Sequence, residues 1–139
     1  MSIRTFAALF GIVFLLAGGS GFVPGLSPEH AHPDMTVTAE SRLALRLFPV
    51  NVVHNVVHLA FGVWGLLAAR GVTGSLIYAR GVAVIYGLLT VLGAIPATST
   101  TFGLVPIYGN DIWLHAGLAA VAAYFGFLHH RGAEGFSRA

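Results

Sequence analysis

The chain has 139 residues, of which 56% are hydrophobic and only 9% are charged, and its mean hydropathy is +0.82. This composition is typical of an integral membrane protein and excludes an ordinary water-soluble domain. The small net charge of +2 is spread over loops and excludes nucleic acid as a partner. Because the chain has no cysteine, disulfides, thiolate metal sites and cysteine nucleophiles are excluded as well.

Four apolar segments have roughly the 20 residues needed to cross the hydrocarbon core of a bilayer. They cover residues 3–23, 50–69, 76–95 and 111–128. These segments predict an all-α integral membrane protein, a four-transmembrane-helix bundle of two helical hairpins, in a single domain over residues 1–139. The second and third segments are expected to be antiparallel neighbours, because the turn between them is very short. A cleavable signal peptide is the alternative for the first segment.

The longest polar connection, residues 24–49, is expected to lie outside the spans. Within it, residues 39–48 predict a short interfacial helix, because apolar side chains accompany two arginines one helical turn apart. Residues 29–34 carry His30 and His32 between acidic side chains. We interpret this stretch as a solvated loop, with a divalent-cation site as the alternative.

The arginines predict which way the chain crosses the membrane. On the predicted topology, five arginines lie on the face that carries both termini and two lie on the other face. The first group is Arg4, Arg70, Arg80, Arg131 and Arg138, and the second is Arg42 and Arg46. The positive-inside rule therefore places the N and C termini in the cytoplasm and residues 24–49 on the outer face.

Polar side chains open the second and fourth spans, close to the outer face. On the second span they fall at i, i+3, i+4 and i+7, which is one stripe of a helix, and on the fourth span Asp and His are four residues apart. The residues are Asn51, His54, Asn55 and His58 on the second span and Asn110, Asp111 and His115 on the fourth. We predict that the two stripes face each other, with a histidine of the second span within hydrogen-bond or shared-ligand distance of Asp111 or His115.

One interpretation of this polar cluster is structural. Side chains that hydrogen-bond across helices hold a membrane bundle in register, since several weak contacts act together. On this interpretation the protein has no evident catalysis. It serves as a structural or accessory subunit of a larger membrane complex, with the lipid bilayer and other subunits, or further copies of itself, as its partners.

The alternative interpretation is cofactor binding, because ionisable groups within membrane spans are costly and are often functional. His54, His58 and His115 are the candidate cofactor ligands, and the same three histidines with Asp111 are the candidate metal ligands, for zinc or copper. A haem or chlorin with a histidine axial ligand is the other cofactor that these residues suit. Both helix N-termini point at the site and favour neutral imidazole, which is the ligating form. No nucleophile motif or phosphate-binding loop supports an enzyme.

Small residues, Trp64 and Arg80 predict further contacts of the spans. Small residues at four-residue spacing, such as Ala83 with Gly87, predict close helix packing in the third and fourth spans. Trp64 lies deep in its span and should pack inward or against a partner protein. Arg80 lies about one turn inside the third span and should snorkel toward cytoplasmic headgroups or pair with Glu134.

The run Leu47–Leu59, together with Asn110–His115, resembles a family of small bacterial four-span membrane proteins known as domain-of-unknown-function family 4383. The resemblance covers about residues 47–130. Family members usually show Asn-Pro-x-His-Asn where residues 51–55 of this chain read Asn-Val-Val-His-Asn, and often Gly at the position of Pro49. These differences alter the start of the helix and keep every polar side chain. The resemblance implies a multi-pass protein of the bacterial inner (cell) membrane and implies no reaction.

Overall fold

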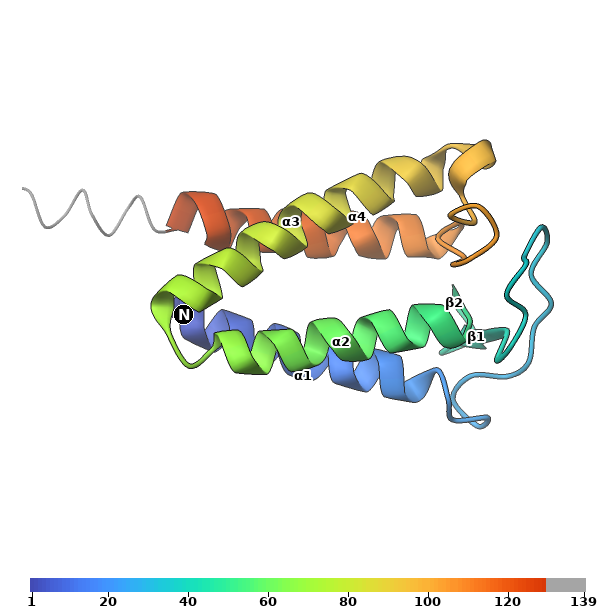
Figure 1. Ribbon diagram of the computed structural model, residues 1–139, viewed down its shortest axis with the longest axis horizontal. Helices are drawn as coiled ribbons and strands as arrows, with labels where there is room; N and C mark the ends of the chain where they lie inside the picture. The colour runs from blue at the N-terminus through green and yellow to red at the C-terminus, as the bar shows by residue number, and fades with distance from the viewer. Residues whose placement is uncertain (130–139) are drawn as a thin grey trace, which may run out of the picture.

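The computed structural model describes residues 1–129 and is built mainly from four helices. They are α1 (Ile3–Ser20), α2 (Val52–Ala68), α3 (Val72–Ala94) and α4 (Asn110–Ala123). A five-residue π-helix, η2 (Tyr124–Leu128), continues α4, and a short 3-10 helix, η1 (Pro96–Thr98), follows α3. Helices α1 and α2 pack along each other, as do α3 and α4, so the molecule consists of two helix pairs (Figure 1). The predicted all-α class and its four helices are confirmed.

The lengths of the helices agree with most of the predicted spans. Within the described residues, Ile3–Ser20, Val72–Ala94 and Asn110–Leu128 are long and apolar enough to cross a membrane. Helix α2 is also apolar but has only 17 residues. Helix α3 begins at Val72 and not at residue 76, because the turn after α2 is even shorter than predicted.

Residues 39–48 do not form the predicted interfacial helix. They contribute instead to an antiparallel hairpin of two short strands, β1 (Arg42–Ala44) and β2 (Phe48–Val50). Between the strands, Leu45 and Arg46 have positive φ angles of 51° and 61°. Two successive residues in the left-handed region reverse the chain and cannot continue a right-handed helix, so the arginine spacing misled the helix prediction.

Glycines bring α1 and α2 close together, in addition to the third and fourth spans, where small residues predict close packing and a Cβ on Gly126 would lie 3.1 Å from the backbone nitrogen of Arg80. A Cβ atom placed on Gly11 would lie 2.9 Å from the carbonyl oxygen of Gly62 and 2.9 Å from the backbone nitrogen of Leu66. A Cβ on Gly65 would lie 2.8 Å from Cα of Gly11. These glycines let the two backbones approach closely, where dispersion forces act over a large area.

The interior of the bundle is largely aromatic. Phe6, Phe14, Tyr78 and Tyr86 are all at most 1% exposed and belong to one core cluster. Trp64 packs against this cluster, with its ring edge-on to Tyr78 at 5.0 Å between centroids. The prediction that Trp64 packs inward is therefore confirmed.

Arg80 ties α3 to the end of the fourth helical segment. Its Nε donates a hydrogen bond of 2.9 Å to the carbonyl oxygen of Gly126, and its guanidinium lies 5.5 Å from the ring centre of Phe127. The alternative partner, Glu134, lies outside the described residues. The side chain thus contacts η2, at the end of α4 opposite to Asp111.

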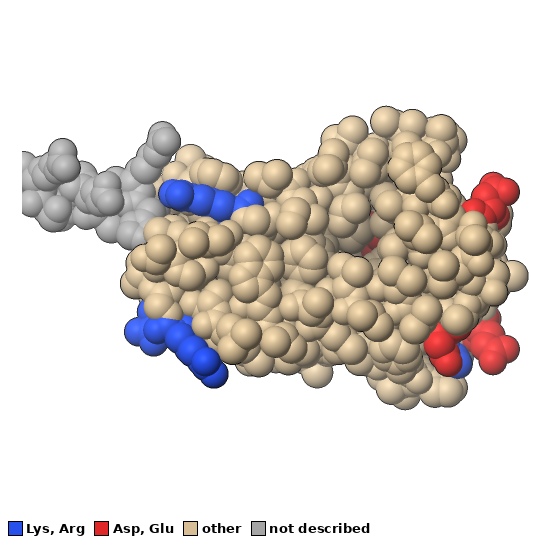
Figure 2. All heavy atoms as spheres, viewed as in Figure 1, with Lys and Arg blue, Asp and Glu red and all other residues tan. Residues whose placement is uncertain are grey.

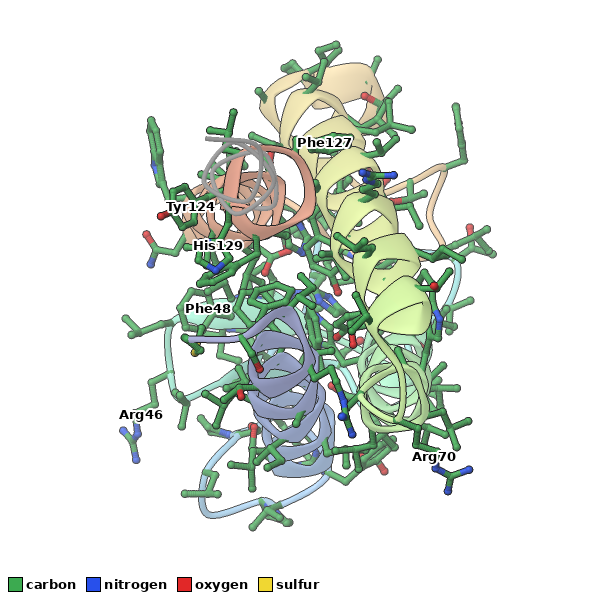
Figure 3. The ribbon with its side chains drawn as sticks, turned by 90° about the vertical axis from the view of Figure 1, so that its left-hand side faces the viewer. Arg46, Phe48, Arg70, Tyr124, Phe127 and His129 are labelled. Atoms are coloured by element: carbon green, nitrogen blue, oxygen red, sulfur yellow. The ribbon has the colours of Figure 1, made fainter. Side chains whose placement is uncertain are left out.

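Charged side chains gather at the two ends of the molecule. Figure 2 shows arginine atoms where α1 begins and where α2 turns into α3, and acidic atoms mostly at the opposite end. The surface between the ends is largely uncharged. Arg46 and Arg70, at opposite ends of the helices, both extend away from the bundle (Figure 3).

Candidate functional site: a buried histidine cluster

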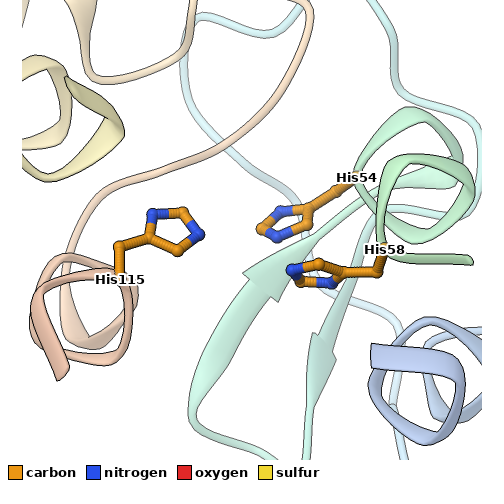
Figure 4. Close-up of side chains that lie close together, drawn as sticks. All are labelled: His54, His58 and His115. Atoms are coloured by element: carbon orange, nitrogen blue, oxygen red, sulfur yellow. The ribbon is translucent and has the colours of Figure 1, made fainter. Parts of the chain in front are cut away.

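Three histidines converge inside the bundle from two different helices. His54 and His58 come from one face of α2, and His115 comes from the second turn of α4 (Figure 4). Each offers one ring nitrogen, and these atoms lie within 4.8 Å of one another. The side chains are 3%, 5% and 1% exposed. The two stripes therefore face each other across the interior of the bundle.

A hydrogen bond to the backbone fixes the orientation of His54. Its Nδ1 lies 3.1 Å from the carbonyl oxygen of Pro106, which can only accept, so Nδ1 carries the hydrogen and donates it. The lone pair of this neutral imidazole is therefore on Nε2. Metal-ligating histidines are commonly held in this way, by a carbonyl group on the nitrogen that does not bind the ion.

Asp111 is buried beside His115 with little to compensate its polar atoms. Its Oδ2 lies 3.4 Å from Nε2 of His115, and both side chains are 1% exposed. Within residues 1–129, neither carboxylate oxygen of Asp111 nor Nδ1 of His115 has a hydrogen-bond partner. Because uncompensated polar groups in an apolar interior are costly, this arrangement favours a site that receives a ligand.

Two aromatic rings that sequence analysis did not single out complete the walls of the cluster. Tyr86 on α3 meets the His115 ring edge-on, at 4.9 Å between centroids. Phe14 on α1 stacks on the His58 ring at 5.6 Å. All four helices thus contribute to the site. Aromatic residues are common in apolar spans, so nothing in the sequence distinguishes these two from the remaining core.

Asn51 is buried but serves the loops above the cluster. As the residue before α2, it accepts a hydrogen bond from the backbone nitrogen of His54 at 3.0 Å. Its Nδ2 donates to the carbonyl oxygens of Val37 and Leu104 at 3.0 and 2.8 Å. Asn51 therefore holds two loops over the histidines without facing them.

Asn55 and Asn110 also turn away from the histidines. Asn55 faces the end of α1, where a Cβ on Gly21 would overlap its amide group. No hydrogen-bond partner for that amide lies in the described part of the chain. Asn110 is exposed and donates to the carbonyl oxygen of Leu47 at 3.3 Å. The polar cluster expected from the sequence is thus divided, and only His54, His58, Asp111 and His115 converge.

His32, in the stretch interpreted as a solvated loop, is only 9% exposed. Its Nε2 lies 3.0 Å from the carbonyl oxygens of both Arg42 and Val50, so this nitrogen carries the hydrogen, and its Nδ1 accepts from the hydroxyl of Tyr108 at 2.9 Å. Burial lowers the pKa of His32 below its usual value of 6.5. Since both ring nitrogens are engaged, His32 is a structural link between the hairpin and the loop before α4.

A cavity of about 180 Å³ adjoins the histidine cluster. Its walls are mainly apolar side chains from α1, the hairpin and α4, and its polar lining comes chiefly from the cluster itself. The lining residues are Val13, Phe14, Ala17, Ser20, Ala44, Leu45, Phe48, Val50, His54, His58, Asp111, Leu114 and Leu118. The cluster is therefore not sealed by close packing on every side.

These features define a class of small four-helix proteins with apolar candidate membrane spans and a buried histidine cluster. Within that class, the family described as Domain of unknown function (DUF4383) matches residues 4–128, and the chain belongs to it. The resemblance noted in the sequence is thereby confirmed, and the match extends to the first helix. No curated protein and no solved structure matches the chain.

Proposed function

We propose that this chain is a multi-pass membrane protein that binds one zinc ion through His54, His58 and His115. The observation that carries this proposal is the convergence of three buried ring nitrogens within 4.8 Å. Imidazole nitrogens suit both zinc and copper, but copper(II) prefers ligands in one plane. Three imidazoles from two helices leave one side of the ion open, as in tri-histidine zinc sites.

The distances between the ring nitrogens determine how far the histidines must move to bind one zinc ion. Two nitrogens that bind one zinc ion at about 2.0–2.1 Å in tetrahedral geometry lie about 3.4 Å apart. Nitrogens up to 4.8 Å apart must then approach by up to about 4.8 − 3.4 = 1.4 Å. Rotation of the imidazoles covers part of this distance, so zinc should also draw α2 and α4 together.

Asp111 supplies the charge that a buried divalent ion needs. Three neutral imidazoles leave the full positive charge of the ion uncompensated in an apolar interior. The carboxylate beside His115 offsets half of this charge, and its Oδ2 is close enough to orient that ring. Asp111 therefore belongs to the site even though the three histidines form its centre.

We also propose that the protein crosses the bacterial inner membrane with both termini in the cytoplasm. Three long apolar helical segments support insertion, and the arginines at the end where α1 begins support the orientation. A reporter that is active only in the periplasm, fused to the C terminus, tests this orientation. Activity of this fusion would show that the C terminus is periplasmic and would contradict the proposed topology. An inactive fusion, together with an active cytoplasmic reporter at the same position, would support the proposed topology.

Elemental analysis and absorption spectroscopy of protein purified in mild detergent test the metal site. We expect about one zinc per chain, and at least about a hundredfold weaker zinc binding in His58→Gln and His115→Gln. His30→Ala is the matched control, because His30 is a histidine of the outer loop and should leave the zinc content unchanged. A folded protein that neither contains nor takes up zinc would contradict this proposal. The interpretation as a structural or accessory subunit would then be preferred. A Soret band in the wild type that is absent from His115→Ala would show that the site binds a tetrapyrrole and not zinc.

A further inference from the structure

We propose that the cavity beside the histidine cluster binds a membrane-soluble molecule with a hydroxyl-bearing head, which enters from the lipid between α1 and α4 and hydrogen-bonds to Asp111. This site stands on the cavity and on Asp111, and it does not require that zinc be bound. The class of ligand is a long-chain or ring-bearing alcohol or phenol. The proposal follows from the position of the cavity, the character of the walls and the unpartnered carboxylate.

The cavity is lined by α1 and α4, one helix from each pair. Helix α1 packs mainly on α2 and α4 mainly on α3, and in the described residues α1 and α4 hardly touch each other. Phe48 of the hairpin lies on this side of the bundle, between α1 and α4 (Figure 3). The hairpin also lines the cavity, so the gap between α1 and α4 is the entry route that we propose.

The outward surfaces of α1 and α4 are suited to lipid. On α1, Val13 and Leu16 are 50% and 68% exposed, and on α4 Trp113 is 76% exposed. In the proposed membrane orientation these side chains contact acyl chains, with the tryptophan near the outer interface. A ligand that reaches the cavity by this route must be dissolved in the membrane.

The walls select the body of the ligand. Leu114 and Leu118 on α4 and Ala17 on α1 contribute apolar surface along the cavity. A volume of about 180 Å³ is more than ten times the roughly 10–15 Å³ that one water molecule needs by the same measure. Because apolar walls bind water poorly, the space is better filled by methylene groups or by a small ring.

Asp111 selects the head of the ligand. The carboxylate lines the cavity, is 1% exposed and receives no hydrogen bond from any described residue. Its Oδ2 lies toward His115, which leaves Oδ1 for a donor from the ligand. An ester or a ketone can only accept a hydrogen bond, whereas a hydroxyl group both donates and accepts and therefore pairs with either protonation state of the side chain. A hydroxyl group supplies the missing donor without adding charge.

Photolabelling in phosphatidylcholine vesicles tests the proposal on the full chain. The probe is a dodecanol with a photoreactive diazirine in mid-chain and a terminal alkyne, and the control probe is its methyl ether, which has no hydroxyl hydrogen. We expect saturable labelling by the alcohol within residues 13–20 and 111–118, displaced by excess dodecanol. The ether should bind about tenfold more weakly, as expected for loss of one hydrogen bond.

Three variants separate a bound ligand from general lipid contact. Ala17→Phe fills the cavity and leaves Asp111 intact, so it should abolish the saturable labelling. Val84→Phe adds the same bulk on an outward face of α3, where Val84 is 64% exposed, and should leave labelling unchanged. Asp111→Asn retains the shape but weakens the acceptor, and it should reduce the preference for alcohol over ether. Thermal unfolding of each variant confirms that it is folded.

Three results would overturn the proposal: equal labelling by alcohol and ether, labelling that survives Ala17→Phe, or preference for a dodecylamine probe over the alcohol. The same labelling on chelator-treated and zinc-loaded protein separates this site from the metal site. Labelling that persists without zinc supports the ligand site even where the zinc proposal fails. Zinc binding without hydroxyl-dependent labelling would contradict the proposed ligand site and leave the proposed zinc site standing.

Discussion

Nδ2 of Asn51 lies 2.8 Å from the carbonyl oxygen of Leu104, and this hydrogen bond joins the start of α2 to the loop that leads into α4. The same side chain accepts from the backbone of His54. One residue therefore fixes both the first turn of α2 and the position of the loop that carries Pro106. Since Pro106 orients His54, Asn51 acts on the histidine cluster indirectly.

Asn51→Ala should lower the free energy of unfolding by about 3 kcal/mol, of which about 1 comes from the lost helix cap and about 1 from each of two lost hydrogen bonds. Thermal or denaturant unfolding in detergent measures the change. Asn51→Ser is the control, because serine can cap the helix but cannot reach the carbonyl groups of Val37 and Leu104. It should recover only about 1 kcal/mol. An Asn51→Ser variant as stable as the wild type would show that the loop contacts contribute nothing.

Gly11→Ala should destabilise the pair of α1 and α2 by about 1–3 kcal/mol, because the new methyl group would press on the backbone of α2. Gly87→Ala is the matched control, since a Cβ at Gly87 in α3 meets no atom of residues 1–129 within 4 Å. The control should be neutral or slightly more stable, given the better helix propensity of alanine. Unfolding midpoints measured in the same detergent compare the two, and a neutral Gly11→Ala would contradict the close approach of the helices.

Acid should destabilise the outer hairpin through His32. Its pKa is lowered in the folded protein by burial, so below about 6.5 the unfolded chain binds the extra proton and the folded chain does not. The contribution to stability is fully present above pH 6.5 and is lost as the pH falls toward the lowered value. Unfolding midpoints of the wild type and His32→Gln between pH 8 and pH 5 measure it as a difference. The variant should lose less stability with acid, and parallel curves would refute the role of His32.

Zinc should raise the unfolding temperature of the wild type, because an ion that binds only the folded state stabilises it by mass action. Above the Kd, each tenfold increase in free zinc should add about 1.4 kcal/mol to the free energy of unfolding. Differential scanning fluorimetry over a zinc series measures the shift. His30→Ala should give the same series as the wild type and His58→Gln a flat one. A rise that is equal in all three proteins would indicate binding elsewhere.

The helices of this chain follow from composition, whereas its hairpin does not. Apolar runs of about 20 residues predict helices because a backbone in an apolar medium must satisfy its hydrogen bonds within the segment. Arg42 and Arg46 have the spacing of a helical turn, and nothing local reveals that Leu45 and Arg46 adopt positive φ angles. Contacts of the hairpin with α4 and with residues before β1 decide that conformation. A local pattern cannot contain this information.

The candidate site was predictable as far as spacing on one helix determines it. His54 and His58 lie four residues apart and share a face of α2, and the short α2–α3 turn brings α3 beside them. Asn55 belongs to the same stripe of α2, yet it contacts the end of α1. The stripe is wide enough to face more than one neighbouring helix. Tyr86 joins the site from α3 and carries no sequence signal that separates it from ordinary core residues.

The unequal lengths of the helices have a consequence for the membrane itself. Helix α2 has 17 residues and is about 26 Å long at 1.5 Å per residue, whereas α3 has 23 residues and is about 35 Å long. In the proposed orientation α3 fits a core of roughly 30 Å by tilting, and Figure 1 shows it inclined to α4. One way to accommodate a helix that is too short is for the bilayer to become thinner around it. Hydrophobic mismatch at α2 should therefore make the protein more stable in short-chain lipids and enrich it in the thinner regions of a membrane.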